Sequence, residues 1–150
     1  MKTPIVGGNR IINGTFGTVW LDGEEIFEVE SFEAAITFNR EDVTMAGNLD
    51  TDSKITGQSG EGSFTVKKVF SRGLAKFIQM TKDGKDVRSQ LIGKLKDPDT
   101  VNGQAERVSI DNVWFNEFTL MQFELGSIIE REFPFGFTPS SVELIDEITF

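Results

Sequence analysis

The residues able to do chemistry in this chain are its carboxylates, because the sequence contains no Cys, His or Tyr. Thiolate nucleophiles, Ser–His–Asp relays and Cys- or His-ligated metals are therefore excluded. Acidic pairs occur at Glu24-Glu25, at Glu41-Asp42 and at Glu130 with Glu132. A glycosidase dyad needs two carboxyls about 5–10 Å apart over a cleft, and no spacing singles out such a pair. Solvated strand faces explain these acids, so we predict no catalytic residue and no enzyme.

Two stretches look like ligand loops but lack essential residues. Gly57-Gln58-Ser59-Gly60-Glu61-Gly62 precedes a strand pattern rather than the helix of a dinucleotide fingerprint, and it has no Gly-Lys-Ser/Thr step. In the acidic stretch that starts at Asp50, Lys54 replaces an oxygen ligand and Ile55 replaces the Gly of a calcium loop. We expect a flexible hinge in the first stretch, and no cofactor or metal in either.

Length and charge narrow the class of protein further. The 150 residues suit one domain, and 15 Lys+Arg against 24 Asp+Glu give a net charge of −9. Such a balance argues against a nucleic-acid clamp, whose affinity comes from cations that neutralise phosphates. No window approaches 18 apolar residues and the first residues lack an apolar signal region. We therefore expect no membrane insertion and synthesis inside the cell.

The elements that would position these residues are mostly strands. Asp22-Gly23 lies between two alternating runs and predicts a type I′ hairpin. A helix is predicted at about 71–83, with Ser71 as N-cap and Gly84 as C-cap. The polar stretch 47–60 predicts a long loop, which is usually functional or disordered. Strand patterns cover 15–21, 24–29, 31–38, 42–46, 61–69, 87–96, 104–113, 114–125 and 128–137.

About eight strands with one helix predict a mainly β domain over 14–150, in which two packed antiparallel sheets form a barrel or sandwich. Residues 1–13 are expected to form a flexible arm. Pro134 lacks an N–H, so its strand should lie at an edge or carry a bulge. Because edge strands can pair with other chains, candidate subunit contacts are Phe133, Pro134, Phe135 and Phe137.

The order of several short motifs across residues 14–138 resembles the PBSX-like (XkdM-type) phage tail tube proteins. Each motif is common, but their order and spacing together are more specific. They are Gly17-Thr18-Val19-Trp20-Leu21-Asp22-Gly23-Glu24-Glu25, Phe32-Glu33-Ala34, the strand ending at Met45–Gly47, Thr56-Gly57-Gln58-Ser59-Gly60-Glu61-Gly62-Ser63-Phe64, Glu106-Arg107-Val108-Ser109-Ile110-Asp111-Asn112-Val113 and Glu132-Phe133-Pro134-Phe135-Gly136-Phe137.

This resemblance implies a structural protein with a fold similar to the Hcp tube of type VI secretion. In the family, hexameric rings stack into a hollow tube inside a sheath, strands of six subunits line the lumen, and a long loop reaches the neighbouring ring. Implied partners are further copies of the chain and sheath, baseplate and terminator proteins, in a virion or tail particle assembled in the bacterial cytoplasm. Candidate inter-ring stacking residues are Asn48, Leu49, Asp50, Thr51, Asp52, Ser53, Lys54, Ile55 and Thr56.

The charge is compatible with a conduit that carries DNA as passive cargo. Six copies at −9 each give −54, and an acidic wall denies DNA phosphates the counterion release that drives binding. The residues leave an alternative open, a monomeric β-barrel that binds a small molecule in an apolar cavity. They also leave open whether the particle is a phage or a bacteriocin.

Overall fold

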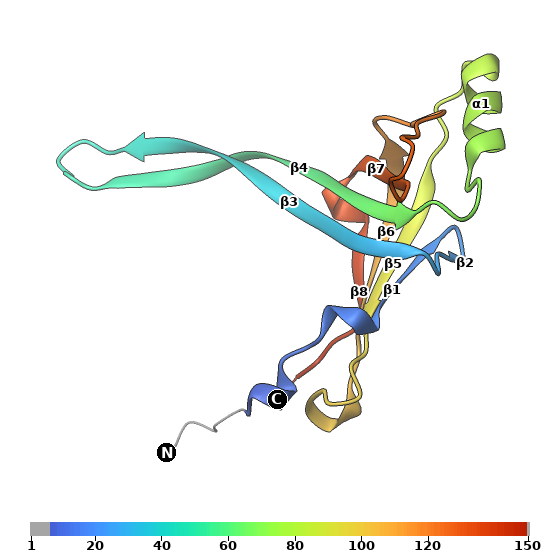
Figure 1. The fold of residues 1–150 in the computed structure, drawn as a ribbon. Coiled ribbons are helices and arrows are strands. Elements are labelled where there is room, and N and C mark those ends of the chain that lie inside the picture. Colours follow the sequence, from blue (N-terminus) through green and yellow to red (C-terminus); the bar gives the residue numbers. More distant parts are fainter. Residues whose placement is uncertain (1–6, 150) are drawn as a thin grey trace.

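The computed structural model describes residues 7–149, which fold mainly into antiparallel strands (Figure 1). Its described elements are η1 (Gly8–Arg10), η2 (Gly14–Phe16), β1 (Gly17–Leu21), β2 (Glu24–Glu25), β3 (Val29–Thr44), β4 (Thr51–Lys67), α1 (Leu74–Asp83), β5 (Ser89–Leu95), η3 (Val101–Gly103), β6 (Glu106–Phe115), β7 (Glu130–Phe137), η4 (Pro139–Ser141) and β8 (Val142–Asp146).

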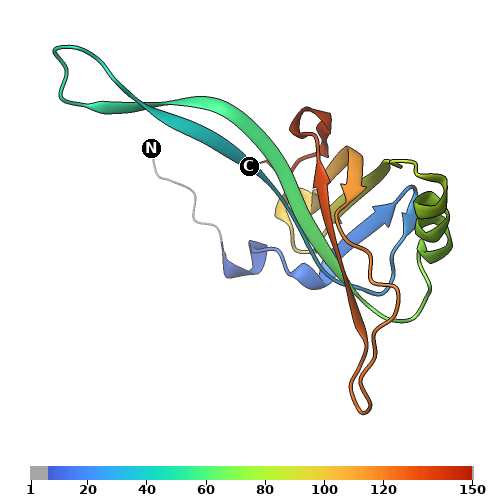
Figure 2. The ribbon, with the colours of Figure 1, turned by 90° about the horizontal axis from the view of Figure 1, so that it is seen from above.

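The strands form one sheet in the order β2-β1-β5-β6-β7-β4-β3, and β8 adds to β6. Strand β6 is the corner, because it pairs with β5 along its length, with β8 near its start and with β7 only at residues 113–115. The sheet folds over at this corner, so that strands β1, β5 and β6 pack on β3, β4 and β7 (Figures 1 and 2). The mainly β class is confirmed. The barrel, however, is not closed, since β2 and β3 at the two ends of the described sheet do not pair.

The core lies between these two layers and is rich in Phe. Phe133, Phe135 and Phe137 alternate on the inner face of β7 and are buried, as their shared strand face predicts. Phe64 of β4 stacks on Phe133 with ring centroids 4.9 Å apart, and Phe32 of β3 stacks on Phe135 at 5.9 Å. Aromatic rings bury a large apolar area, so they contribute most of the free energy that holds the two layers of the sheet together.

Two glycines of β4 make this packing possible. Gly60 pairs across the strands with Phe137, and Gly62 pairs with Phe135. A Cβ atom at Gly62 would lie 2.6 Å from Cζ of Phe135, and one at Gly60 would lie 2.7 Å from Cζ of Phe137. Because glycine has no Cβ atom, the rings of Phe135 and Phe137 can lie directly over the β4 backbone at these two positions. The predicted hinge at 57–62 is wrong, because this stretch is part of β4.

The first hairpin and the end of the helix match the sequence prediction. Asp22 and Gly23 both have positive φ, 50° and 84°, which is the type I′ geometry. Helix α1 ends at Gly84 in the left-handed region (φ 65°), as its C-cap role predicts. Its start is corrected: Gly73 is the N-cap (φ 66°), so Ser71 lies outside the helix.

The predicted long loop at 47–60 is mostly strand. Residues 51–60 belong to β4 and pair with β3 as far out as Thr44↔Thr51, which leaves only residues 45–50 as the connection. Backbone hydrogen bonds make this pairing, so it needs no apolar alternation in the sequence. The result is a hairpin that projects far beyond the body (Figures 1 and 2).

A second correction concerns the predicted strand pair 104–113 and 114–125. Strand β6 runs without a break from Glu106 to Phe115, and the chain then follows a non-strand connection to Glu130. Trp114, at the expected break, pairs instead with Gly136 and packs on it. The connection from residue 116 to 129 was therefore missed by the sequence analysis.

The predicted N-terminal arm at 1–13 lies partly outside the described residues. Within them, the backbone N–H of Asn13 donates to Asp97 (2.9 Å), and the Arg10 guanidinium donates to the carbonyl oxygens of Asp99 (3.2 Å) and Thr100 (3.4 Å). These bonds join the segment before β1 to the turn after β5. The division at residue 13 stays a prediction.

Candidate assembly surfaces

The projecting hairpin, which we call the arm (residues 36–59), is the first candidate surface. Strand β7 covers β4 only from Gly60 to Lys67, so the arm has no third strand beside it. Its inner face continues the face that carries Phe32 and Phe64 into the core. Beyond the body this face still bears large apolar side chains, since Ile36 is 38%, Phe38 49% and Ile55 42% exposed.

A bulge and a tight connection shape the outer part of the arm. The register shifts between Asn39 and Arg40, where Thr56 is the extra residue and its hydroxyl donates to the Asn39 carbonyl oxygen (3.3 Å). Such a bulge bends and twists the paired strands. At the tip Gly47 has φ 82°, and the Asn48 side chain accepts a hydrogen bond from the Asp50 N–H (3.0 Å).

All the residues proposed to stack against a neighbouring ring lie in the outer arm and are exposed. Asn48, Leu49 and Asp50 are in the tip, and Leu49 is fully exposed. The others belong to strand β4, and they are Thr51, Asp52, Ser53, Lys54, Ile55 and Thr56. The structure thus brings this predicted set together at one end of the molecule.

The second predicted set, on β7, is placed differently. Phe133, Phe135 and Phe137 point into the core, and Phe135 is fully buried. Their rings therefore pack inside the subunit and offer no outer surface. The predicted edge position or bulge is wrong, because β7 lies between β4 and β6 and pairs with β4 without a register shift. Pro134 pairs with Ser63 of β4, and its carbonyl accepts from the Asn116 N–H (3.0 Å), in the part of β7 that β6 does not pair.

The outer face of β3, β4 and β7 has a different composition from the core face. Over the body it is made of small and polar residues with four carboxylates, Glu33, Glu61, Glu130 and Glu132. Lys67, which pairs with Glu130, and Arg88 lie at its borders, and Lys54, which pairs with Glu41, lies on the same face farther out on the arm. Close to Lys67, a hydrogen bond with Glu30 raises the pKa of Glu130. The small and polar residues of this face are Ser31, Ala35, Thr37, Asn39, Gly57, Ser59, Ser63, Thr65, Pro134 and Gly136.

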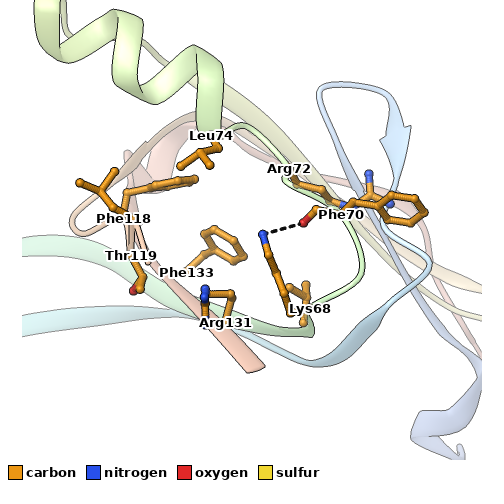
Figure 3. Close-up of a pocket in the computed structure, with 10 residues that line it drawn as sticks. Lys68, Phe70, Arg72, Leu74, Phe118, Thr119, Arg131 and Phe133 are labelled. Atoms are coloured by element: carbon orange, nitrogen blue, oxygen red, sulfur yellow. Dashed lines mark hydrogen bonds between the residues drawn. The ribbon is translucent and has the colours of Figure 1, made fainter. Parts of the chain in front are cut away.

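A small basic cleft lies at the other end of the body, beside the start of α1 (Figure 3). Arg72 there is matched by acids: its guanidinium donates to both Glu28 oxygens and to Glu24 (2.9 Å). These hydrogen bonds lower the pKa of Glu28 and raise that of Arg72. The cleft is lined by Val66, Lys68, Phe70, Arg72, Leu74, Phe118, Thr119, Leu120, Arg131 and Phe133.

The sequence analysis missed this cleft because its residues come from separate segments. One signal was present: Arg131 is the only charged residue on the Phe face of β7. Among residues 7–149, no three or more Asp or Glu side chains converge in a way that would hold a metal. In the same range, no helix is both long and apolar enough to cross a membrane.

Known proteins resemble this chain in sequence and in fold. A family model described as "Phage tail tube protein" matches residues 5–146. The "Phage-like element PBSX protein XkdM" of Bacillus subtilis (strain 168) is 33% identical over 127 residues, which is 84% of this chain and 86% of that protein.

Solved structures are similar in fold at much lower identity. The tube-terminating cap of the anti-feeding prophage has a TM-score of 0.72 at 12% identity and covers 96% of this chain and 97% of its own. A chain of the sheath-tube complex of an extracellular contractile injection system (PVC) has a TM-score of 0.69 at 12% identity, with 93% of each chain covered. At this identity the likeness shows the fold.

Proposed function

Because the chain belongs to the phage tail tube protein family, we propose that it assembles as hexameric rings whose arms join each ring to the next. The chain is a tail tube subunit and a component of a phage-tail particle. The ring, the contact made by the arm and assembly in the bacterial cytoplasm are the proposed parts. No catalytic step is proposed, since the role is structural.

The observation that carries this proposal is the continuation of the core face along the arm. Ile36, Phe38 and Ile55 lie on the strand face that is buried in the body, yet in the described chain between a third and a half of each side chain stays exposed. Full burial of a side chain of this size is worth about 1.5–3 kcal/mol, so covering the part that is still exposed would gain about half of that. A neighbouring copy that covers the arm would supply that burial, and assembly would then recover what the isolated subunit leaves exposed.

The outer face of β3, β4 and β7 is the proposed lining of the channel. Over the body it carries Glu33, Glu61, Glu130 and Glu132, with Lys67 and Arg88 at its borders and Lys54 beside Glu41 on the arm. DNA binds a protein when rows of Lys and Arg neutralise its phosphates and release their counterions. A channel wall without such a row would let DNA pass without binding it. Sheath, baseplate and terminator proteins are proposed partners, by analogy with the sheath-tube complex that contains a similar fold.

The cavities do not favour the alternative of a barrel that binds a small molecule. The basic cleft has a volume of ≈ 20 Å³, and a second hollow beside Asp22 and Lys76 has ≈ 140 Å³. Small-molecule sites usually occupy about 300–1,000 Å³. The tube subunit is therefore the function that the geometry supports best.

A shortened arm tests the proposal. Deleting residues 40–56 joins Asn39 directly to Gly57, which places an Asn-Gly turn next to the Phe38↔Gln58 pair, as a type I′ hairpin requires. We expect the variant to stay folded, with its Tm within about 5 °C of the parent chain, but to form no tubes under negative-stain microscopy. Long tubes from this variant would show that the arm is not needed for assembly. A parent chain that stays monomeric even when short preformed tubes are added as seeds would overturn the proposed tube assembly.

Cysteine accessibility tests the channel face, because the chain has no Cys of its own. In assembled tubes, Ser59→Cys should react with a small maleimide and be protected from one carried on a large polymer. Lys82→Cys, on the exposed surface of α1, is the matched variant on another face. In dissociated subunits both cysteines should react with both reagents. Equal reaction of Ser59→Cys with both reagents in tubes would place this face outside the channel.

A further inference from the structure

The basic cleft and the arm tip have complementary chemistry and lie at opposite ends of the subunit. We infer that the cleft between β7, the 116–129 connection and the segment before α1 receives the acidic arm tip of a second copy. This inference rests on the proposed ring-to-ring role of the arm and names the surface that the arm contacts.

Two cations of the cleft are not paired with acids. Arg131 is only 7% exposed, and its guanidinium donates to the carbonyl oxygens of Gln122 (2.7 Å) and Glu130 (3.1 Å). The Lys68 ammonium donates to the Phe70 carbonyl oxygen (3.0 Å), as Figure 3 shows. Among the ion pairs of the described residues, neither side chain has a carboxylate partner. Arg131 is a cation held away from water, which favours a matching anion, and Lys68 beside it is exposed and open to a partner. The cleft is therefore suited to a carboxylate.

The size of the cleft and the residues at its rim limit the kinds of group that it can bind. A volume of ≈ 20 Å³ holds about one water molecule, so the preformed space takes one oxygen of a carboxylate and excludes a metabolite. Phe70 and Leu120, both exposed, form an apolar rim around it. The occupant should therefore carry a carboxylate next to an apolar side chain.

The arm tip is a segment of this kind. Asp50 and Asp52 form no ion pair in the described chain, and Met45 and Leu49 beside them are exposed. The tip thus presents acids with apolar neighbours, where the cleft presents cations with an apolar rim. Opposite charges on two docking surfaces fix their register and suppress wrong partners.

The placement of the two surfaces makes the contact one between copies. The arm leaves the body in one direction, whereas α1 lies on the opposite side of the body in both views (Figures 1 and 2). The cleft is lined by Leu74 at the start of α1, so it lies on that side too. A tip cannot reach the cleft of its own chain at this separation. A contact between two different surfaces is heterologous, so each copy can offer its tip to one neighbour and its cleft to another. The same contact can therefore repeat from one ring to the next, as a stack of rings requires.

Disulfide trapping with mixed chains tests this contact. Tubes assembled from equal amounts of an Asp52→Cys chain and a Lys68→Cys chain should give covalent dimers on oxidation, with peptides around the two positions joined in the mass spectrum. The matched control pairs Asp52→Cys with Lys82→Cys and should give no such species. Tubes that form normally but yield no 52–68 crosslink would overturn the inference and leave the proposed tube intact. Absence of tubes from the parent chain would instead contradict the proposed function itself.

A charge exchange provides a second readout. Lys68→Glu should raise the concentration needed for tube growth about tenfold or more, because like charges then face each other. Adding Asp52→Lys to the same chain should bring that concentration back to within about threefold of the parent value. The control Lys82→Glu should leave it within about twofold. Assembly of the Lys68→Glu variant at the parent concentration would count against the contact.

Discussion

The two halves of strand β4 lie in different surroundings. Residues 60–67 lie between β3 and β7, and their inner side chains are sealed by the Phe rings of β7. Residues 51–59 pair only with β3, and their inner face stays in water. The backbone pairing with β3 is nevertheless continuous apart from two bulges, one between Val29 and Ser31 and one between Asn39 and Arg40. Pairing therefore extends beyond the part of the sheet whose burial stabilises the subunit.

In the proposed tube, this difference would separate the residues that stabilise the fold from the residues that make the contacts of assembly along a single hairpin. The body end gains its stability inside the subunit, because its rings are already buried. The arm end gains little in the isolated subunit, so its apolar side chains are available to a neighbour. Substitutions at the two ends should accordingly change different measurements, and paired variants can test that separation.

The largest expected difference is between Phe135→Ala and Phe38→Ala. Phe135 is fully buried, so its truncation should lower the free energy of unfolding by about 4 kcal/mol. Phe38 is 49% exposed, and its truncation should cost less than about 1 kcal/mol. Urea unfolding of dissociated subunits measures both values. In the assembly assay, Phe38→Ala should raise the concentration needed for tube growth about tenfold. Relative to the stability that each variant loses, this effect on assembly should be larger for Phe38→Ala than for Phe135→Ala.

Similar losses of stability at the two positions would break the comparison. That result would mean that the arm packs on the body in solution, and that its inner face is not left for a neighbour. Normal assembly by Phe38→Ala would show that the apolar stripe of the arm is not a contact.

A smaller difference is expected between two glycines of the same strand. In Gly62→Ala the new methyl group would lie 2.6 Å from Phe135 Cζ and 2.9 Å from the Ala34 Cα, so the strands must shift. Overpacking of this kind should cost about 2 kcal/mol. In Gly57→Ala the methyl group meets the Asn39 side chain at an ordinary 3.4 Å, and the lost flexibility of the unfolded chain should add up to about 0.5 kcal/mol of stability.

Thermal unfolding of the two variants under identical conditions measures this second contrast. If Gly62→Ala were as stable as the parent chain, the seating of the Phe rings on β4 would be wrong. If Gly57→Ala were strongly destabilised, the outer arm would be packed more tightly than its exposure indicates.

The body was predictable from the sequence because its signals are local. Asp22-Gly23 requires positive φ values, and Gly84 ends the helix for the same reason. The inner face of β7 alternates clearly, since one side of that strand is buried. Each of these signals depends on residues close in the chain, and each was confirmed.

The strands of the arm could not be predicted from the sequence. Alternation of apolar and polar residues indicates that one face of a strand is buried, and it says nothing about backbone pairing between exposed strands. Residues 51–56 are all exposed, so nothing in their sequence separates an inner from an outer face. The glycines at 60 and 62 indicated flexibility, whereas their role depends on Phe rings some 75 residues later in the chain. The cleft escaped prediction for the same reason, as Lys68, Phe118 and Arg131 meet only after the sheet has folded.

The smallest expected effect concerns Glu28, which ties the start of β3 to the segment before α1 through Arg72. The Arg72 hydrogen bonds lower the pKa of Glu28 below its ordinary 4.5. A lowered pKa in the folded state gives stability that is present above pH 4.5 and is lost as the pH falls through the folded value. Glu28→Gln should therefore cost about 1 kcal/mol at pH 7 and flatten the decline of stability as the pH falls below 4.5.

Glu41→Gln on the arm is the matched control for this effect. Glu41 is exposed and forms no ion pair among the described residues, and exposed pairs contribute at most about 1 kcal/mol even when they form. Its replacement should leave both the stability at pH 7 and the acid profile unchanged. Urea midpoints measured at several pH values for the two variants decide the matter. A flatter profile for Glu41→Gln than for Glu28→Gln would place the acid-sensitive contact in the arm, because the loss would then follow the exposed hairpin and not the buried end of β3.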